Sequence, residues 1–517
     1  MIEARTCRNL IYMEFDNSAR ENWFDLRAKK FLHNIDTFYY TVKLSNDFTK
    51  NTEDKAALNV RKYFDNIIDR TSFDACIPLN IPGADMQLNI RPFHYAGFYN
   101  INIQCPELFD IFIADTVPPG ENGESVTSEI IVQLRSYFLW QYGATKAFEY
   151  SYEAVKLICS YFSLNITEVK ENRIDYCWHS NYIQNPEKYF RIDNFAKMQV
   201  SRYKRIHYEY AFKPDDEYEN DYISLGKRSD KCFVRIYLKS KEVIEKGYKP
   251  WFFKEWLFNG LINRYDYYVY EEAFKKQSWK YVDVARLKFY LEYGTDDIQR
   301  QLCSAIVSGE VKKSDEYILK LADRLTPRVT LIINIEYQTT RRMTKSYNLK
   351  LTKDNEDKEE CRRIYDYLDN RYLITEYLTH STLRLVKASG DGNKSRADYT
   401  DFWKALRSCR MVDVKKSPKD LKLTRDYTRN MNKEVVKKRL MNATITYTLY
   451  EKGINRDSVL DDCIHVLTRL NDNDIYDMQR IKDKRIMLLN NMLLKEQLDN
   501  IPQKRFSILN NETGEIT

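Results

Sequence analysis

One tyrosine stands between two cations at a spacing that suits chemistry on phosphates. Arg235, Tyr237 and Lys239 alternate with aliphatic residues, a pattern that predicts a strand with Tyr237 framed by positive charge on one face. A phenol with a pKa near ~10 is a weak nucleophile at neutral pH, and neighbouring cations favour its phenolate and attract a phosphate. We therefore predict phosphoryl transfer at Tyr237, with Arg235 and Lys239 as its catalytic neighbours.

Two other short segments place an acid two residues after an arginine. They are Arg173–Asp175 and Arg264–Asp266, within stretches 172–178 and 263–270 that we interpret as strands. If these strands neighbour that of Tyr237, Asp175 and Asp266 share its surface, where two carboxylates can hold Mg²⁺ or Mn²⁺. The alternative interpretation is that each arginine simply balances an acid on an ordinary strand surface.

His179 is a candidate third metal ligand. It has the same strand parity as Asp175, so a continuing strand places both side chains on one face. The alternative is a hydrogen-bonded structural histidine. The chain has only 6 histidines and neither an HxH nor an HExxH pattern, which argues against metal sites built on a histidine pair and against zinc hydrolases.

The positive charge of the chain is concentrated in one segment. The net charge of the 517 residues is +7, yet residues 404–439 contain thirteen Lys or Arg and four acids. Cations gathered on one face neutralise DNA phosphates, whereas the alternative is a solvated helical surface. The predicted DNA-binding residues are Lys415, Lys416, Lys419, Lys422, Arg425, Arg429, Lys437, Lys438 and Arg439.

Periodicity predicts an α+β fold. Strand patterns at 34–42 and 86–114 alternate with helical patterns at 55–68 and 148–162, whereas helical patterns dominate beyond 297. We predict an N-terminal extension (1–33), an antiparallel-sheet catalytic domain with packed helices (34–297), and a mostly helical C-terminal region for DNA binding or an accessory role (298–517). A β-like run at 328–338 can belong to either side of the last boundary.

Composition bears on the compartment. The first twenty residues contain no apolar run of signal-peptide length, and no later stretch approaches the ~18 apolar residues of a membrane span. Ten cysteines occur without a CxxC pair, which is typical of reduced thiols. We expect a cytoplasmic protein without a membrane partner.

Three ordered blocks resemble the replication initiation factors of the Rep_trans type, which are rolling-circle initiators of small Gram-positive plasmids, and the related relaxases of conjugative elements. The blocks are Asn172–Asn181, Ser224–Glu242 with its RIYLKSKE run, and Ile262–Phe274, and the spacer before the last contains Trp251 and Trp256. The resemblance spans about residues 34–290. Asp266 stands where the family pattern has Glu, and His179 where a second acid often follows.

The resemblance implies a nicking reaction on origin DNA. Tyr237 would attack one strand, become linked to a 5′ phosphate and release a 3′ hydroxyl, with Asp175 and Asp266 on the metal and Glu242 in support. The implied partner is nicked or single-stranded origin DNA of a plasmid, phage or conjugative element. A host helicase and a homodimer are left open as further partners.

Two other classes of function remain open from the sequence. A non-catalytic protein that binds an origin or operator would keep the fold and the salt-sensitive DNA binding, yet would tolerate Tyr237→Phe. A structural or interaction protein would need neither the phenol nor the basic segment.

Overall fold

The computed structural model describes residues 23–24, 29–68, 77–83, 86–91, 97–118, 127–201, 203, 206–212, 218–344, 359–387, 394, 396–411 and 440–448, with short stretches between 461 and 479. The chain divides into two compact units, Met1–Thr424 and Arg425–Thr517. In the second unit, residues 440–448 form a helix. Among the described residues, no helix combines the length and the apolar character needed to cross a membrane.

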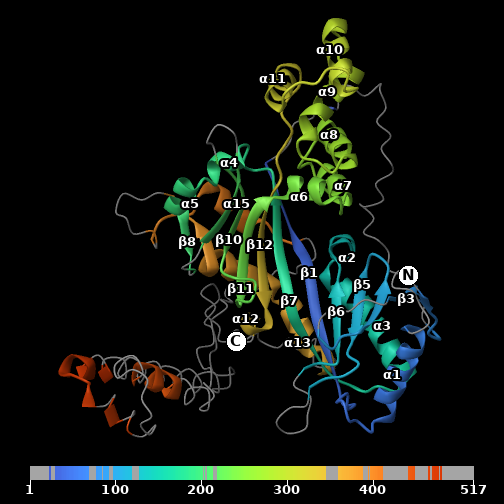
Figure 1. Ribbon diagram of the computed structural model, residues 1–517, viewed down its shortest axis with the longest axis vertical. Helices are drawn as coiled ribbons and strands as arrows, with labels where there is room; N and C mark the ends of the chain where they lie inside the picture. Colours follow the sequence, from blue (N-terminus) through green and yellow to red (C-terminus); the bar gives the residue numbers. More distant parts are fainter. Residues whose placement is uncertain are drawn as a thin grey trace, which may run out of the picture. The chain divides into compact units, whose positions relative to one another are not determined.

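An antiparallel sheet organises the first unit (Figure 1). In the described part of the chain it has eleven strands in the order β2-β3-β4-β5-β6-β1-β7-β12-β11-β10-β9. The strands are β1 (Phe31–Leu44), β2 (Ile77–Leu79), β3 (Leu88–Arg91), β4 (Ile101–Cys105), β5 (Phe109–Ile113), β6 (Ile130–Leu134), β7 (Ile166–Ser180), β9 (Ile206–Phe212), β10 (Tyr218–Leu225), β11 (Cys232–Leu238) and β12 (Ile333–Thr340). A separate pair joins β8 (Gln199–Ser201) to β13 (Leu383–Leu385).

Helices account for most of the remaining described structure. They are α1 (Lys55–Ile68), α2 (Ser136–Tyr142), α3 (Ala144–Phe162), α4 (Pro186–Tyr189), α5 (Ile192–Met198), α6 (Lys239–Lys246), α7 (Trp251–Phe258), α8 (Arg264–Lys275), α9 (Tyr281–Tyr293), α10 (Asp297–Val307), α11 (Asp315–Leu325), α12 (Arg341–Thr344), α13 (Arg362–Asp369), α14 (Arg371–Tyr377) and α15 (Asp401–Ser408). The predicted α+β class, with helices packed on an antiparallel sheet and a helical C-terminal region, is confirmed.

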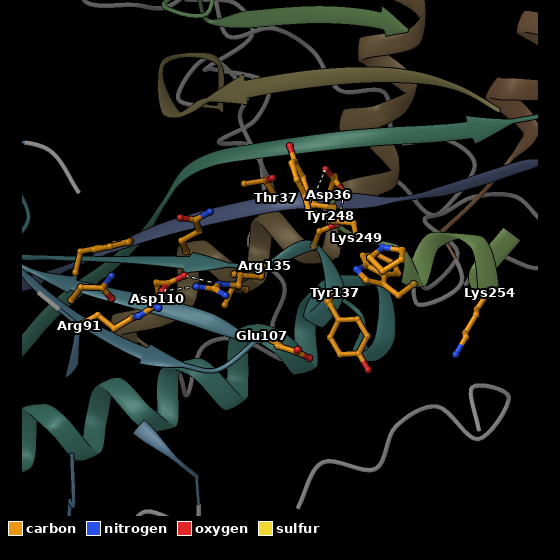
Figure 2. A pocket seen from close by; sticks show the side chains of 17 residues that line it. Asp36, Thr37, Arg91, Glu107, Asp110, Arg135, Tyr137, Tyr248, Lys249 and Lys254 are labelled. Atoms are coloured by element: carbon orange, nitrogen blue, oxygen red, sulfur yellow. Dashed lines mark hydrogen bonds and ion pairs between the residues drawn. The ribbon is translucent and has the colours of Figure 1, made fainter. Parts of the chain in front are cut away.

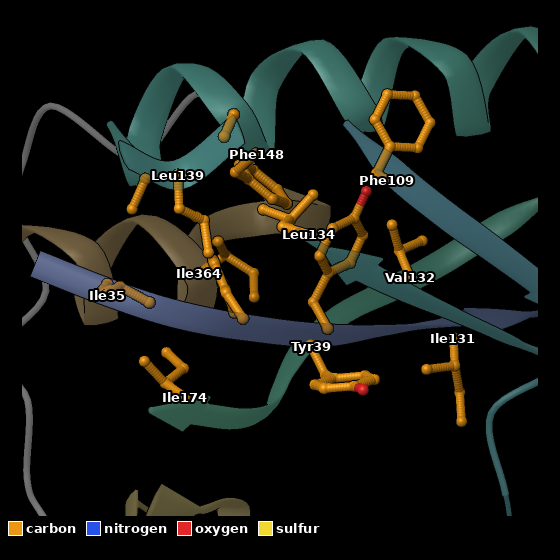
Figure 3. Close-up of a cluster of buried hydrophobic side chains, with 14 of the residues drawn as sticks. Ile35, Tyr39, Phe109, Ile131, Val132, Leu134, Leu139, Phe148, Ile174 and Ile364 are labelled. Atoms are coloured by element: carbon orange, nitrogen blue, oxygen red, sulfur yellow. The ribbon is translucent and has the colours of Figure 1, made fainter. Parts of the chain in front are cut away.

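The two faces of the sheet differ because side chains alternate along each strand. Ile174, Val234 and Ile335 of the central strands point to one face and are buried there. This face packs against α3, α13, α14 and α15 in the main hydrophobic core. Figure 3 shows part of that core, where Phe148 of α3 and Ile364 of α13 lie over the strands. The opposite face carries the polar side chains of the same strands.

A second group of helices covers one end of the polar face. Helices α6, α7, α8 and α9 share a core that contains Trp256, Tyr265 and Tyr270, and α9, α10 and α11 share a smaller one. Cys177 and His179 of β7 reach the first of these cores from the sheet. Helices α6 to α9 therefore form a border to the part of the polar face that they do not cover.

The prediction of a strand at 263–270 is wrong, because these residues belong to α8. The side chain of Asn263 caps the helix by accepting from the backbone N–H of Asp266, and the Asp266 carboxylate accepts from the backbone N–H of Asn263. Such a capping box satisfies amides that a helix leaves unpaired at its start. The run of tyrosines, which is typical of strands, therefore packs on helical faces in the core instead.

Strand β12 comes from beyond the predicted boundary at residue 297. It pairs with β7 on one side and with β11 on the other, so it lies inside the sheet. The first compact unit accordingly continues to Thr424. The position of the β-like run, which the sequence left open, is settled in favour of the sheet.

Ile335→Ala tests the central position of β12. Ile335 is 0% exposed, so removing its side chain should lower the free energy of unfolding by about 2–5 kcal/mol, measured by urea denaturation. The matched control is Ile298→Ala in α10, where the isoleucine is 77% exposed, and we expect a change within about 0.5 kcal/mol. Equal effects of the two substitutions would contradict the placement of β12.

Candidate active site

Tyr237 lies on the polar face of β11, and its hydroxyl is surrounded by polar groups. The hydroxyl donates to Oε2 of Glu336 over 2.9 Å. It accepts from Nδ2 of Asn334 over 2.9 Å and from Nζ of Lys239 over 3.4 Å. The ring of Tyr222 on the neighbouring strand lies 6.2 Å away between centroids. The phenol is thus held in one orientation by groups from two strands and the first residue of α6.

Glu336 was not predicted from the sequence. It lies opposite Arg235 in the pairing of β12 with β11 and forms an ion pair with it. The side chain of Glu336 is 2% exposed, so its carboxylate is a buried acceptor aimed at the Tyr237 hydroxyl. The sequence does show alternation in 333–338, which puts Asn334 and Glu336 on one face of a strand. That alternation does not predict which strand lies next to it, so it could not place Glu336 beside Tyr237.

The environment keeps the phenol protonated. Burial raises the pKa of Tyr237 well above its ordinary value, and the nearby carboxylate of Glu336 raises it further. Lys239 and Arg235 oppose the shift without cancelling it. The two cations thus favour the phenolate, as expected, but burial and Glu336 outweigh them and the pKa of Tyr237 stays raised. At neutral pH, Tyr237 needs a base to become a nucleophile, and Glu336 is the carboxylate that already accepts its hydrogen bond.

Lys239 is a buried cation held by acids. Its ammonium lies 2.6 Å from the Glu242 carboxylate, the residue for which the family resemblance implies a supporting role. Burial by itself lowers the pKa of Lys239, but Tyr237, Asp36 and Glu242 outweigh burial and raise it well above its ordinary value. Lys239 is therefore charged beside the phenol.

Asp175 lies on the same polar face, in β7 on the other side of β12. Arg173 binds it with two contacts, from Nε to Oδ1 over 2.9 Å and between the terminal nitrogen and Oδ2 over 2.5 Å. Burial raises the pKa of Asp175 to about 7; the bond from Arg173 opposes this shift, and the charge of Glu336 adds to it. Asp175 and Glu336 thus interact electrostatically across the two strands.

His179 is enclosed by aromatic rings. It is 0% exposed, its ring stacks on Trp140 at 4.9 Å between centroids, and Trp256 donates its Nε1 hydrogen to Nδ1 over 3.2 Å. Burial, together with the charge of Lys239, lowers its pKa well below the ordinary value. The neutral ring then carries its proton on Nε2, which leaves no lone pair for a metal.

Asp266 is used by the fold. It is 0% exposed, and besides the capping box it accepts from the backbone nitrogen and the hydroxyl of Thr330 at 2.9 and 2.7 Å. These bonds tie the start of α8 to the segment that leads into β12. The carboxylate therefore lies in a helix cap rather than on the sheet face that carries Tyr237 and Asp175.

The predicted metal ligands do not form one site. Asp175 is held by Arg173, His179 by an indole, and Asp266 by its helix cap. Within the ranges that the structure describes, no group of three or more His, Cys, Asp or Glu side chains is arranged to hold a metal ion. These residues do not fit the Mg²⁺ or Mn²⁺ site that the sequence suggested.

The nine predicted DNA-binding cations, from Lys415 to Arg439, lie outside the described residues. Their role in binding DNA stays a prediction.

Comparisons with known proteins find little similarity. No family model matches the chain, and no curated protein matches it. Among solved structures, the chain is similar to one described as "Structure of Rolling Circle Replication Initiator Protein from Geobacillus stearothermophilus". The two are 13% identical with a TM-score of 0.32, and the match covers 73% of this chain and 95% of that chain. Similarity at this level does not by itself assign a fold or an activity.

Asp266→Ala tests whether this carboxylate is structural. Its loss leaves a helix start and Thr330 without partners, so we expect the free energy of unfolding to fall by about 2–4 kcal/mol without any added metal. The control is Asp297→Ala, which removes an 85% exposed acid from the first turn of α10 and should change stability by less than about 1 kcal/mol. Unchanged stability of Asp266→Ala in metal-free buffer would contradict the structural role.

Asp175→Asn tests the raised pKa through the pH dependence of stability. The pKa of Asp175 is about 7 in the folded protein, against an ordinary value of 3.8. The folded state therefore binds the proton more tightly than the unfolded state, and the free energy of unfolding of the parent falls as pH rises between these two values. We expect the free energy of unfolding of the variant, relative to the parent, to increase by up to about 4 kcal/mol between pH 4 and 8.

The chain offers a matched control for this measurement. Arg191–Asp193 repeats the Arg-Ile-Asp sequence, but the Asp193 side chain is 73% exposed. Asp193→Asn should leave the pH dependence of unfolding unchanged. A difference between Asp175→Asn and the parent that is constant with pH would contradict the shift.

Proposed function

We propose that the protein nicks and rejoins one strand of DNA through Tyr237, as an initiator of rolling-circle replication or transfer. The observation that carries the proposal is the hydrogen bond from the Tyr237 hydroxyl to the buried carboxylate of Glu336, beside the cation of Lys239. A nucleophile, a base and a positive charge are the groups that a phosphoryl transfer needs. The choice of DNA as substrate rests on the sequence blocks around Asp175 and Tyr237.

The proposed step balances without an external nucleophile. The oxygen of Tyr237 attacks the phosphorus of one phosphodiester while Glu336 takes the phenolic proton. A bond forms between Tyr237 and the 5′ phosphate, and the bond from phosphorus to the 3′ oxygen breaks. The departing oxygen takes a proton from water and becomes the 3′ hydroxyl that primes synthesis. The step converts the phosphodiester of the DNA into a phosphodiester with Tyr237, so the bond energy is retained. The reverse step, in which the 3′ hydroxyl attacks that phosphorus, rejoins the strand.

Two cations have separate tasks in this proposal. Lys239 lies close enough to the phenol oxygen to stabilise the charge that develops on the attacking oxygen and on the phosphoryl group. Arg235 pairs with Glu336 and thereby orients the base. Asn334 donates to both the phenol and Glu336, which limits rotation of the two side chains.

The requirement for Mg²⁺ or Mn²⁺ stays a separate proposal. The predicted ligands do not converge, so no step of the mechanism above passes through a metal. Adduct formation measured with each ion and with EDTA determines whether a cation is needed.

A non-catalytic protein that binds an origin or operator is the second candidate. It is favoured by the ion pairs that already occupy the charged groups, Arg235 with Glu336 and Lys239 with Glu242, and by the raised pKa of Tyr237. In such a protein the polar network would stabilise the sheet. DNA binding would then survive Tyr237→Phe, and no covalent product would form.

Covalent adduct formation decides between these functions. The protein is incubated with a supercoiled plasmid that carries the DNA flanking its coding sequence, with Mg²⁺ or Mn²⁺, then denatured and analysed for protein attached to nicked DNA. We expect an adduct with the parent and none with Tyr237→Phe. Glu336→Gln, which keeps the shape but cannot take the proton, should slow the reaction by about 10²–10⁴-fold.

Tyr222→Phe is the control, because this tyrosine faces the same surface on the adjoining strand. It should form the adduct at the parent rate. An adduct that persists in Tyr237→Phe identifies another nucleophile, whereas bound DNA without any adduct excludes the nicking function.

A further inference from the structure

A large cleft lies on the polar face beside the candidate active site. Its volume is about 1340 Å³, larger than the roughly 300–1,000 Å³ of most small-molecule sites. Strands β3 to β6 and the start of α2 line one part of it, and β1 and the segment entering α7 line the rest. Figure 2 shows Arg91, Asp110 and Arg135 on the strand side and Lys254 on the side of α7.

Exposed aromatic rings line the cleft next to the start of α7. Trp251 is partly exposed, and its ring stacks on that of Phe252 at 3.9 Å between centroids. Tyr137 meets Trp251 edge to face at 5.6 Å, and Tyr248 is 49% exposed. Flat rings held in fixed positions at a groove are suited to stacking against unpaired bases, which every base sequence can supply.

Charged side chains line the cleft on both of its sides. Asp110 is bound by Arg135 at 2.7 and 2.9 Å, and Asp36 pairs with Lys249 at 3.3 Å. The other charged residues of the lining are the cations Arg91 and Lys254 and the acid Glu107. Arg91 and Lys254 come from opposite sides of the cleft, so a strand that passes through it meets a cation on each side.

A buried amide adds a contact for bases. Asn102 is 3% exposed and lines the cleft, and its side-chain oxygen has no hydrogen-bond partner among the described residues. A buried oxygen without a partner is unfavourable, and the amino group of a base would satisfy it. Duplex DNA exposes amino groups in its grooves but no free base faces, so it is the stacking rings of the lining that favour a single strand.

Charged side chains connect the cleft to the proposed nucleophile. Asp36 belongs to its lining, and its carboxylate interacts electrostatically with both Lys249 and Lys239. Lys239 in turn donates to the Tyr237 hydroxyl. Asp36 and Lys239 therefore link the lining of the cleft to the phenol, which itself lines a separate, smaller pocket.

We infer that this cleft binds single-stranded nucleic acid, with bases stacked on Trp251 and its aromatic neighbours and phosphates on Arg91 and Lys254. That the bound strand is the one cut at Tyr237 rests on the proposed function; the binding itself does not. The cleft would keep the DNA next to the cleaved bond single-stranded.

Fluorescence anisotropy tests the inference with the full chain. The probe is a labelled mixed-sequence oligodeoxynucleotide of about 16 nucleotides, compared with its duplex, in EDTA and in a Tyr237→Phe background that prevents any adduct through this tyrosine. We expect Trp251→Ala to weaken single-strand binding by at least about fivefold and duplex binding by less than about twofold. Phe258→Ala is the control, because Phe258 is 46% exposed on the same helix but outside the cleft.

Lys254→Gln provides a second variant that removes no core packing partner. It should weaken single-strand binding and reduce the slope of log affinity against log salt by about 0.7, as expected for one lost phosphate contact. Trp251→Phe should recover part of the affinity that alanine loses. If Trp251→Ala and Lys254→Gln bind like Phe258→Ala, or weaken duplex binding equally, the inference is overturned. Because no step is catalytic, this result is independent of whether Tyr237 forms an adduct.

Discussion

The pairing of β12 between β7 and β11 is the constraint on which the site depends. It places Glu336 opposite Arg235 and next to Tyr237, and it separates Tyr237 from Asp175 by one strand. Any other position of β12 would leave the phenol without its acceptor. The same pairing buries Ile335 in the main core, so the free energy that stabilises the sheet also holds the candidate base in position.

Burial determines the electrostatics of this face. Charges taken out of water are costly unless they are paired, and Glu336, Asp175 and Lys239 each have a partner of opposite charge. The resulting pKa shifts run against a simple count of cations: the phenol is kept protonated although Arg235 and Lys239 lie beside it. A mechanism at this site therefore depends on proton transfer to Glu336 rather than on a preformed phenolate.

Several features were accessible from sequence patterns, and others were not. The strand of Tyr237 and the helix at 55–68 follow from local periodicity, which is a property of neighbouring residues. The same local reasoning failed at Asp266, where β-forming tyrosines suggested a strand while Asn263 supplied a helix cap. Asp266 was consequently assigned to metal binding, although its oxygens are used in a cap and by Thr330.

The sequence by itself established an α+β chain, a tyrosine flanked by cations on one strand face, and a basic segment near the C-terminus, because composition and alternation are local quantities. The tertiary structure alone decided which strands are neighbours, and hence that Glu336 rather than Asp266 accompanies Tyr237. It also decided that the cleft beside Trp251 exists. Strand pairing over about a hundred residues of separation is set by how apolar faces pack together, and the alternation within a strand carries no information about its partner.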